Sequence, residues 1–131
     1  MELRISSLLL DEIRAAAAGS PNAEICGLLL GRDGRVEAVV ECANVAAEPA
    51  DSFEIDPAAL VAAHRAARAG APVPIGHYHS HPNGRAEPSE RDAAAAEAGS
   101  YWIIATHDDL RCWRALSGAR FAPVAIIPDN R

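Results

Sequence analysis

Three histidines stand at every second position just before a proline, and a serine and an aspartate follow after a short polar loop. If this segment forms a strand, the side chains of His77, His79 and His81 share one face, because side chains alternate along a strand. Ser89 opens an alanine-rich run that is typical of a helix, which puts Asp92 in the first helical turn. Two imidazoles and a carboxylate that converge in this way can bind zinc, and three protein ligands leave the fourth tetrahedral position open, as in catalytic zinc sites. The pattern therefore predicts a catalytic zinc site.

Ser89 and Asp92 also have a purely structural interpretation. A serine followed three residues later by an aspartate is typical of a helix N-cap with an acidic first turn. The two interpretations agree for Ser89, whose hydroxyl can cap the helix and also face the site. They compete for Asp92, whose carboxylate would have to leave the helix end to reach a metal. The neighbouring pair of histidines favours the metal.

The spacing of these residues resembles the signature of a known enzyme family. The order is His79-x-His81, seven residues, Ser89, two residues and Asp92, with Pro82 also matching. This is similar to the motif of the JAMM metalloproteases, also called MPN-plus or JAB domains. The resemblance implies that His79, His81 and Asp92 hold one Zn²⁺ per chain.

The other pair of histidines fits this motif less well. If His77 and His79 were the pair, Glu87 would stand at the serine position and Glu90 at the aspartate position. Two mismatches exclude that register. His77 is then a neighbour on the same face, and its role stays open, including a supporting role behind the ligands.

A zinc hydrolase also needs a group that moves protons beside the attacking water. Glu24 leads directly into the apolar run Ile25-Cys26-Gly27-Leu28-Leu29-Leu30-Gly31. On its own, Glu24 could be a solubilising charge at a strand end. It also resembles the family's catalytic glutamate, which precedes a similar glycine- and leucine-containing stretch. The resemblance therefore implies that Glu24 is the proton shuttle and that the Ser89 hydroxyl stabilises the oxyanion.

The resemblance implies a substrate class as well. Family members cleave peptide or isopeptide bonds at the glycine-rich C-terminal tail of a ubiquitin-like or sulfur-carrier protein. This chain has little room for the extra segments that grip ubiquitin in chain-cleaving members, which favours the stand-alone bacterial or archaeal type. Two other classes stay open: a non-catalytic MPN-type interaction module, and a zinc amidase that acts on small molecules or on cell-wall peptides.

Composition limits the remaining possibilities. A chain of 131 residues suits one domain over residues 1–131. Lysine and arginine number 12 against 18 acidic residues, a net charge of −6, and we see no basic patch, so nucleic acid is not expected as a partner. The sequence carries no signal-peptide pattern and no apolar stretch long enough to span a membrane. We expect a cytoplasmic protein that does not bind membranes, and its oligomeric state stays open.

The number and spacing of the cysteines agree with a cytoplasmic location. Cys26, Cys42 and Cys112 are an odd number, lie far apart in the sequence and form no C-x-x-C pair. They are expected to be reduced thiols and not disulfides or zinc ligands.

The predicted elements form an α/β (α+β) domain, a mixed and largely antiparallel sheet flanked by three helices, and the resemblance implies the JAMM/MPN (cytidine-deaminase-like) type. Capping residues mark the helices, and apolar runs or alternation mark the strands. The helices are expected at residues 7–18, 57–69 and 89–98. The strands are expected at 2–5, 25–30, 36–42, 53–56, 72–80, 101–106, 110–116 and 121–127.

Overall fold

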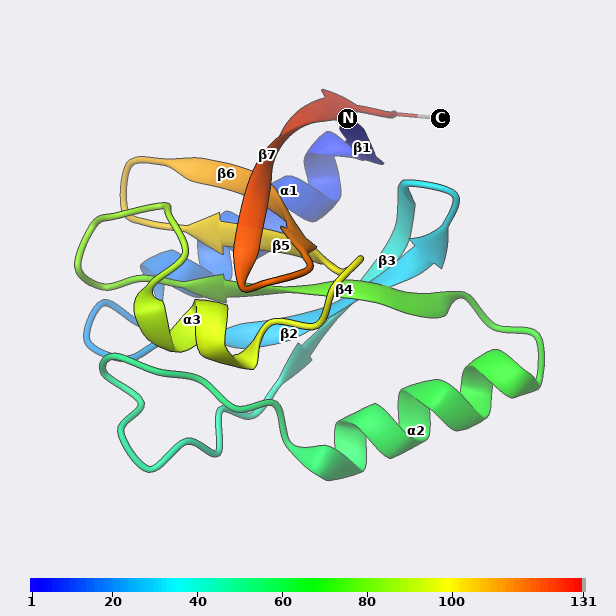
Figure 1. The fold of residues 1–131 in the computed structure, drawn as a ribbon. Coiled ribbons are helices and arrows are strands. Elements are labelled where there is room, and N and C mark those ends of the chain that lie inside the picture. The colour runs from blue at the N-terminus through cyan, green and yellow to red at the C-terminus, as the bar shows by residue number, and fades with distance from the viewer. Residues whose placement is uncertain (131) are drawn as a thin grey trace.

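The computed structural model describes residues 1–130, which form seven strands and three helices. In chain order these are β1 (Glu2–Ile5), α1 (Ser7–Ala18), β2 (Cys26–Arg32), β3 (Arg35–Cys42), α2 (Pro57–Arg68), β4 (Val73–Ser80), α3 (Glu90–Ala95), β5 (Tyr101–Ala105), β6 (Leu110–Leu116) and β7 (Arg120–Pro128). Figure 1 shows α1 on the far side of the strands, with α2 and α3 on the near side.

The strands form one sheet in the order β1-β3-β2-β4-β5-β6-β7. The ladders β2–β3, β2–β4, β5–β6 and β6–β7 are antiparallel, and β4 and β5 pair in parallel. The short strand β1 pairs in parallel with both β3 and β7 and so closes the sheet into a barrel. The predicted mixed, largely antiparallel sheet with three helices is confirmed, and the closure through β1 adds to it.

Helix α1 begins and ends at the expected residues. The Ser6 hydroxyl accepts a hydrogen bond from the backbone N–H of Leu9 at 3.2 Å, and Gly19 ends the helix. Its buried side chains pack into the core that fills the barrel; they are Leu10, Ile13 and Ala17. This helix therefore supports the sheet from the side away from α2 and α3.

The strands β2 and β3 form the predicted hairpin. Asp33 and Gly34 both have positive φ, 53° and 73°, as the two central residues of a type I′ turn require. β2 is buried along most of its length, as the continuous apolar run predicts, and lies between β3 and β4. The acidic residue before β2 therefore lies beside the strand that carries the histidines.

The path of β4 depends on a glycine. At Gly76 the backbone of β5 approaches so closely that a Cβ atom would collide with the backbone of Tyr101. The same pairing continues to the end of the strand, where His79 lies opposite Ile104 and Ser80 opposite Ala105. Gly76 thus allows the parallel register that fixes the histidine-bearing end of β4.

Helix α3 is shorter than the sequence indicates. The alanine-rich run continues to Ala98, but the helix ends at Ala95 and Ala96 is extended. Bonds to β6 explain the early end, because Gly99 N–H donates to the Ala115 carbonyl at 2.8 Å and holds the following chain beside that strand. Tertiary pairing has overridden helix propensity here.

The predicted strand at 53–56 is reduced to one bridge between Asn44 and Ile55. The Asn44 side-chain oxygen accepts the backbone N–H of Glu54 at 3.0 Å, in the place of a ladder partner. The segment therefore keeps an extended shape without forming a regular strand.

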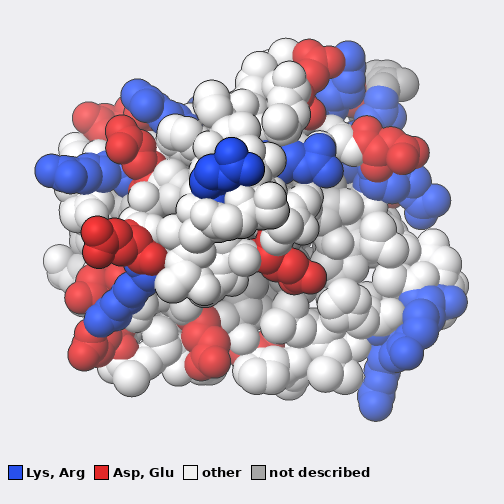
Figure 2. Space-filling model, viewed as in Figure 1, with Lys and Arg blue, Asp and Glu red and all other residues white. Residues whose placement is uncertain are grey.

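No helix in residues 1–130 is long and apolar enough to cross a membrane. Figure 2 shows acidic and basic side chains interspersed on the face that carries α2 and α3. The net negative charge is therefore not gathered into one patch on this face.

Candidate metal centre

Two of the three histidines lie buried at the end of β4. His79 is fully buried and His81 is 4% exposed. The backbone N–H of His81 donates to the Ala105 carbonyl at 2.9 Å, so the pairing with β5 extends one residue beyond the strand. Alternation along β4 then places both imidazoles on one face, and their ring centroids lie 4.8 Å apart.

Asp92 reaches the histidines from the first turn of α3. Ser89 caps this helix: its hydroxyl accepts the Asp92 N–H at 3.1 Å, and the Asp92 Oδ2 accepts the Ser89 N–H at 2.9 Å. The same Oδ2 lies 3.3 Å from Nε2 of His79 and 3.0 Å from Nε2 of His81. The capping and site interpretations therefore do not compete, because one carboxylate does both.

Three donor atoms thus converge at one point. The Nε2 atoms of His79 and His81 are 3.0 Å apart, and the Asp92 oxygen lies beside both. Ligand bonds of about 2.0–2.1 Å in a tetrahedron put neighbouring ligand atoms roughly 3.3 Å apart, close to this spacing. The geometry and the donor types both fit a zinc ion.

The protonation states also suit a metal. Nδ1 of His81 lies 2.8 Å from the Arg85 carbonyl, which can only accept, so Nδ1 carries a proton and Nε2 faces the Asp92 carboxylate. Burial acts to lower the pKa of His81, but its hydrogen bonds to Asp92 and to the Arg85 carbonyl outweigh burial and raise that pKa. In the metal-free site Nε2 can therefore also hold a proton, which a bound metal would replace. Burial lowers the pKa of His79 and favours its neutral form. Burial acts to raise the pKa of Asp92, but the hydrogen bonds to the two imidazoles outweigh it and hold that pKa below its ordinary value. The set is therefore two imidazoles and an ionised carboxylate.

Glu24 lies beside this cluster. The residue is 5% exposed, and its Oε1 is buried with no hydrogen-bond partner in residues 1–130. Ligand atoms of Glu24, His79 and His81 all lie within 4.8 Å of one another. Burial raises the pKa of Glu24 to about 7, which allows the group to accept and release a proton near neutral pH.

The segment between β3 and α2, residues 43–56, holds Glu24 in place. The backbone N–H of Glu24 donates to Pro49 at 2.7 Å, and the Asn44 side chain donates to the Glu24 carbonyl at 2.9 Å. From α3, Arg91 donates to Glu48 and to Asp51, each at 3.1 Å. Residues 43–56 therefore connect the acid to the helix that carries Asp92.

The aromatic side chain of Phe53 covers the histidines from the same segment. Its ring stacks on His79, with centroids 4.2 Å apart and an interplanar angle of 20°. Nδ1 of His79 is buried and has no hydrogen-bond partner in residues 1–130, so ring packing and not a second hydrogen bond orients this imidazole. The sequence assigned no site role to Phe53, Asn44 or Arg91, because their contacts join segments that lie far apart in the chain.

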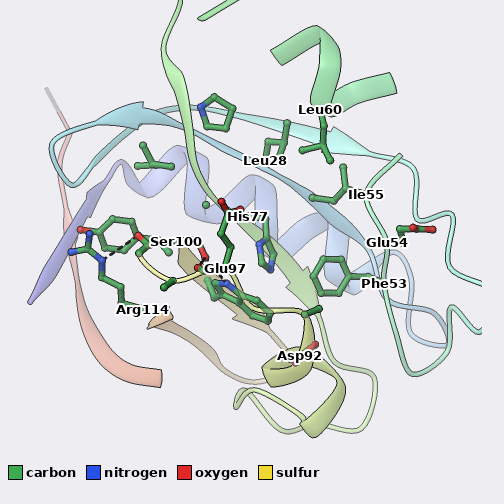
Figure 3. A pocket seen from close by; sticks show the side chains of 18 of the residues that line it. Leu28, Phe53, Glu54, Ile55, Leu60, His77, Asp92, Glu97, Ser100 and Arg114 are labelled. Carbon is green, nitrogen blue, oxygen red and sulfur yellow. Dashed lines mark hydrogen bonds between the residues drawn. The ribbon is translucent and has the colours of Figure 1, made fainter. Parts of the chain in front are cut away.

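A groove of about 960 Å³ runs along β4 from Asp92 towards Arg114. Figure 3 shows Phe53 and Ile55 on one side of it, with Glu97 and Ser100 on another. Leu28 and Leu60 add apolar surface. The groove is large enough for an extended peptide, and it reaches the cluster at Asp92, which lines it.

The remaining histidines are not part of the cluster, although His77 lies next to it. His64 is exposed on α2 and His107 is 78% exposed on the turn after β5. His77 lines the groove, with its ring centroid 5.3 Å from that of His79, and burial lowers its pKa well below the ordinary value. The cysteines Cys26, Cys42 and Cys112 are free thiols.

Known proteins resemble this chain over nearly its whole length. A desampylase from Haloferax volcanii is 35% identical over 121 residues, which cover 90% of this chain and 87% of the relative. A probable TtuB-protein conjugate cleaving protease from Thermus thermophilus is 34% identical over 118 residues, which cover 90% of this chain and 79% of the relative.

Solved structures agree on the fold. A solution structure of a Desulfitobacterium hafniense protein has a TM-score of 0.85 and 26% identity and covers 98% of this chain and 94% of that one. A crystal structure of a JAB1/MPN domain protein from Archaeoglobus fulgidus has a TM-score of 0.61 and 21% identity, with 96% and 97% coverage. At that identity, the second likeness concerns the fold alone.

The family described as prokaryotic homologs of the JAB domain matches residues 6–116. That match includes Glu24 and the whole stretch from the histidines to Asp92. The two relatives each align with 90% of this chain. The chain belongs to the prokaryotic JAB family.

Proposed function

We propose that this chain is a zinc-dependent peptidase that cleaves peptide or isopeptide bonds at the C-terminal tail of a ubiquitin-like or sulfur-carrier protein. It would act as one domain over residues 1–131, in the cytoplasm. The observation that carries the proposal is the convergence of His79 Nε2, His81 Nε2 and Asp92 Oδ2 within 3.3 Å of one another, beside the buried carboxyl group of Glu24.

We propose zinc as the metal. Two imidazoles and one carboxylate occur in catalytic zinc sites and also in non-haem iron sites, whereas magnesium and calcium prefer oxygen ligands. The spacing of the three donor atoms fits a tetrahedron and favours zinc. His79, His81 and Asp92 would hold one ion per chain. When bound, zinc would act as a Lewis acid and lower the pKa of a water molecule in the open position.

Glu24 would move the protons of the reaction. With a pKa raised to about 7 by burial, a useful fraction of Glu24 is ionised at neutral pH. The carboxylate would take a proton as water oxygen bonds to the carbonyl carbon of the scissile amide. It would then give that proton to the leaving nitrogen as the C–N bond breaks.

Ser89 would stabilise the negative oxygen formed during this attack. Its hydroxyl oxygen already accepts the N–H of Asp92 at 3.1 Å, which leaves the hydroxyl proton available to donate. Losing one such donor has cost about 2.7–4 kcal/mol of transition-state stabilisation in another enzyme. Ser89 thus combines helix capping with a proposed catalytic role.

The substrate class rests on the two curated relatives. One is a desampylase and the other a probable TtuB-protein conjugate cleaving protease, and both cover 90% of this chain. The groove along β4 supports a protein-tail substrate, because an extended chain can lie in it and reach the cluster.

Cleavage by zinc-loaded protein tests the proposal. The probe is a ubiquitin-like protein linked through its terminal Gly-Gly to a lysine side chain, and released protein is measured by gel. The wild-type chain is expected to cleave it, and Glu24→Gln is expected to hold zinc and lose nearly all turnover. If Glu24→Gln cleaved the probe at the wild-type rate, the assignment of Glu24 as the proton shuttle would be wrong. A zinc-loaded chain that cleaves a panel of small amides and no protein conjugate would favour the amidase alternative.

A further inference from the structure

Two of the three cysteines lie opposite each other on neighbouring strands. Cys26 on β2 pairs with Cys42 on β3, and on its other side it pairs with His79 on β4. Opposite residues of adjacent strands point to the same face, so Cys42, Cys26 and His79 form one row across these three strands, which Figure 1 labels. A pair of thiols therefore lies on the face that carries the proposed zinc site.

The backbone spacing of this pair suits a disulfide. The Ser80 N–H donates to the Ile25 carbonyl at 3.1 Å, so the backbone of Ile25 faces β4. Because hydrogen-bonding directions alternate along a strand, the backbone of Cys26 faces β3, and Cys26 and Cys42 form a hydrogen-bonded pair. The Cα atoms of such a pair lie about 5.5 Å apart, within the range of roughly 4.4–6.8 Å that disulfides span.

The two sulfur atoms differ in direction and in exposure. Sγ of Cys26 lies 3.6 Å from the Cys42 carbonyl oxygen, so it is already directed at β3. Sγ of Cys42 lies 3.4 Å from the Val40 carbonyl oxygen, and this side chain has to rotate to meet Cys26. Cys26 is fully buried and Cys42 is partly exposed, so an oxidant reaches Cys42 first.

Cys112 lies on the other face of the sheet. It pairs with Ile103, and Ile103 pairs with Tyr78. Tyr78 alternates with His79 along β4, so this second row points into the core of the barrel. The cysteines therefore comprise one pair and one isolated thiol.

We propose that Cys26 and Cys42 form a thiol–disulfide modification site, in which oxidation joins their Sγ atoms and slows the proposed reaction. The oxidant is a small disulfide molecule. Its S–S bond breaks as the Cys42 sulfur bonds to one half, and the other half leaves as a thiol with the Cys42 proton. The Cys26 sulfur then bonds to the Cys42 sulfur, and the second half leaves as a thiol with the Cys26 proton. Two protein thiols are oxidised and one small disulfide is reduced.

The new bond would act on Glu24 through the backbone. The Cβ atoms of a disulfide lie about 3.8 Å apart, against about 4.5–5.5 Å for opposite residues of a ladder, so the bond draws β2 and β3 together. Glu24 lies two residues before Cys26, and Asn44 lies two residues after Cys42. The Asn44 side chain donates to the Glu24 carbonyl at 2.9 Å. The contraction therefore falls on the link that holds the proposed proton shuttle, and its effect on turnover rests on the proposed function.

Peptide mapping of the zinc-loaded protein tests the site without a substrate. The protein is treated with hydroxyethyl disulfide at alkaline pH, because burial raises the pKa of both thiols, and the remaining thiols are alkylated after unfolding. Trypsin cleaves at Arg32 and Arg35, between the two cysteines, so a disulfide joins two separate peptides. We expect this joined pair, with Cys112 alkylated and the zinc content unchanged. Alkylated Cys26, or the reagent left bound to Cys42, would overturn the inference.

Turnover of the ubiquitin-like conjugate measures the effect on Glu24. The oxidised wild-type protein is expected to show a kcat about tenfold below that of the reduced protein, because small displacements of a catalytic group are costly, and a phosphine reductant should restore it. Cys42→Ser cannot form the disulfide, and its kcat should not respond to the reagent. Cys112→Ala is the matched control and should respond as the wild type does. A mapped disulfide with unchanged kcat would overturn the link to Glu24. A reduced wild-type protein that does not cleave the conjugate would contradict the proposed function and leave the mapped site standing.

Discussion

The hydroxyl of Ser80 accepts a hydrogen bond from the backbone N–H of Ile25 at 2.9 Å, and the Ser80 N–H donates to the Ile25 carbonyl at 3.1 Å. Ser80 lies between the two buried histidines, and Ile25 follows Glu24 directly. This pair of bonds therefore fixes the distance between the proposed proton shuttle and the proposed zinc ligands.

Replacing Ser80 by alanine tests that connection. Ser80→Ala removes the acceptor of the Ile25 N–H, and the resulting shift of Glu24 is expected to lower kcat about ten- to hundredfold, because small misplacements of catalytic groups are costly. Zinc content is expected to stay at the wild-type level. Ser80→Thr keeps the hydroxyl, and a cavity of about 220 Å³ that Ser80 lines offers room for the extra methyl, so this variant should retain most of the activity. Equal kcat for Ser80→Ala and wild type would contradict the positioning role.

The raised pKa of Glu24 predicts a pH effect on the stability of the metal-free protein. Burial raises this pKa from 4.5 to about 7, so between these values the folded state binds more protons than the unfolded state. Stability contributed by the protonated carboxyl is complete below about pH 4.5 and is lost as the pH rises through about 7. Glu24→Gln stays neutral and should lose less stability over this range, as measured by urea unfolding at several pH values. Glu12→Gln, an exposed change on α1, is the control and should follow the wild-type curve. Parallel curves for Glu24→Gln and wild type would show that the carboxyl titrates normally.

Breaking the ion pairs of Arg91 is expected to loosen residues 43–56 and to leave the stability of the whole fold nearly unchanged. Its partners Glu48 and Asp51 are exposed, and exposed ion pairs contribute little to the free energy of unfolding because water screens them. Arg91→Gln should therefore leave global stability nearly unchanged. Hydrogen exchange in residues 43–56 should become faster, because this segment loses its bonds to α3. Arg14→Gln removes an exposed pair with Asp11 elsewhere and should leave that exchange unchanged. Unchanged exchange in Arg91→Gln would mean that the backbone bonds alone hold the segment.

The close approach at Gly76 predicts a large loss of stability on substitution. A Cβ atom at this position would collide with the backbone of Tyr101, which cannot move without disturbing the β4–β5 ladder. Gly76→Ala should destabilise the fold by at least about 1–3 kcal/mol, the usual cost of overpacking. Gly70→Ala is a useful comparison, because no atom lies within 4 Å of a Cβ there and only its positive φ of 102° opposes the change. A Gly76→Ala variant as stable as wild type in thermal unfolding would contradict this close packing.

Local signals predicted most of the elements. The cap at Ser6 and the stop at Gly19 predicted α1, and the start at Asp56-Pro57 predicted α2. Such signals can be recognised in the sequence because capping involves residues that are close together in the chain. The Asp33-Gly34 turn likewise gave the hairpin. The sequence also singled out His79, His81 and Asp92, which lie together in the structure, since they occur within one short stretch. Their roles stay predictions.

Long-range contacts explain what the sequence did not reveal. The closure of the sheet depends on β1 pairing with β7 from the other end of the chain, and no local pattern encodes that register. The early end of α3 depends on the bond from Gly99 to Ala115, which a propensity-based reading of alanines does not include. The contacts of residues 43–56 with Glu24 and Arg91 join segments that lie far apart in the chain, and no periodicity in the sequence records such contacts.

Zinc content of purified variants tests the central claim most directly. After zinc loading and dialysis, we expect one zinc per chain in the wild-type protein and in Glu24→Gln, and none in His79→Ala, His81→Ala or Asp92→Asn. Asp92→Asn is the most informative of these, since the asparagine side-chain oxygen can still accept the Ser89 N–H and only the charged donor is lost. Circular dichroism establishes that each variant is folded. Equal zinc in folded Asp92→Asn and wild type, or no zinc in the wild-type protein, would contradict the account.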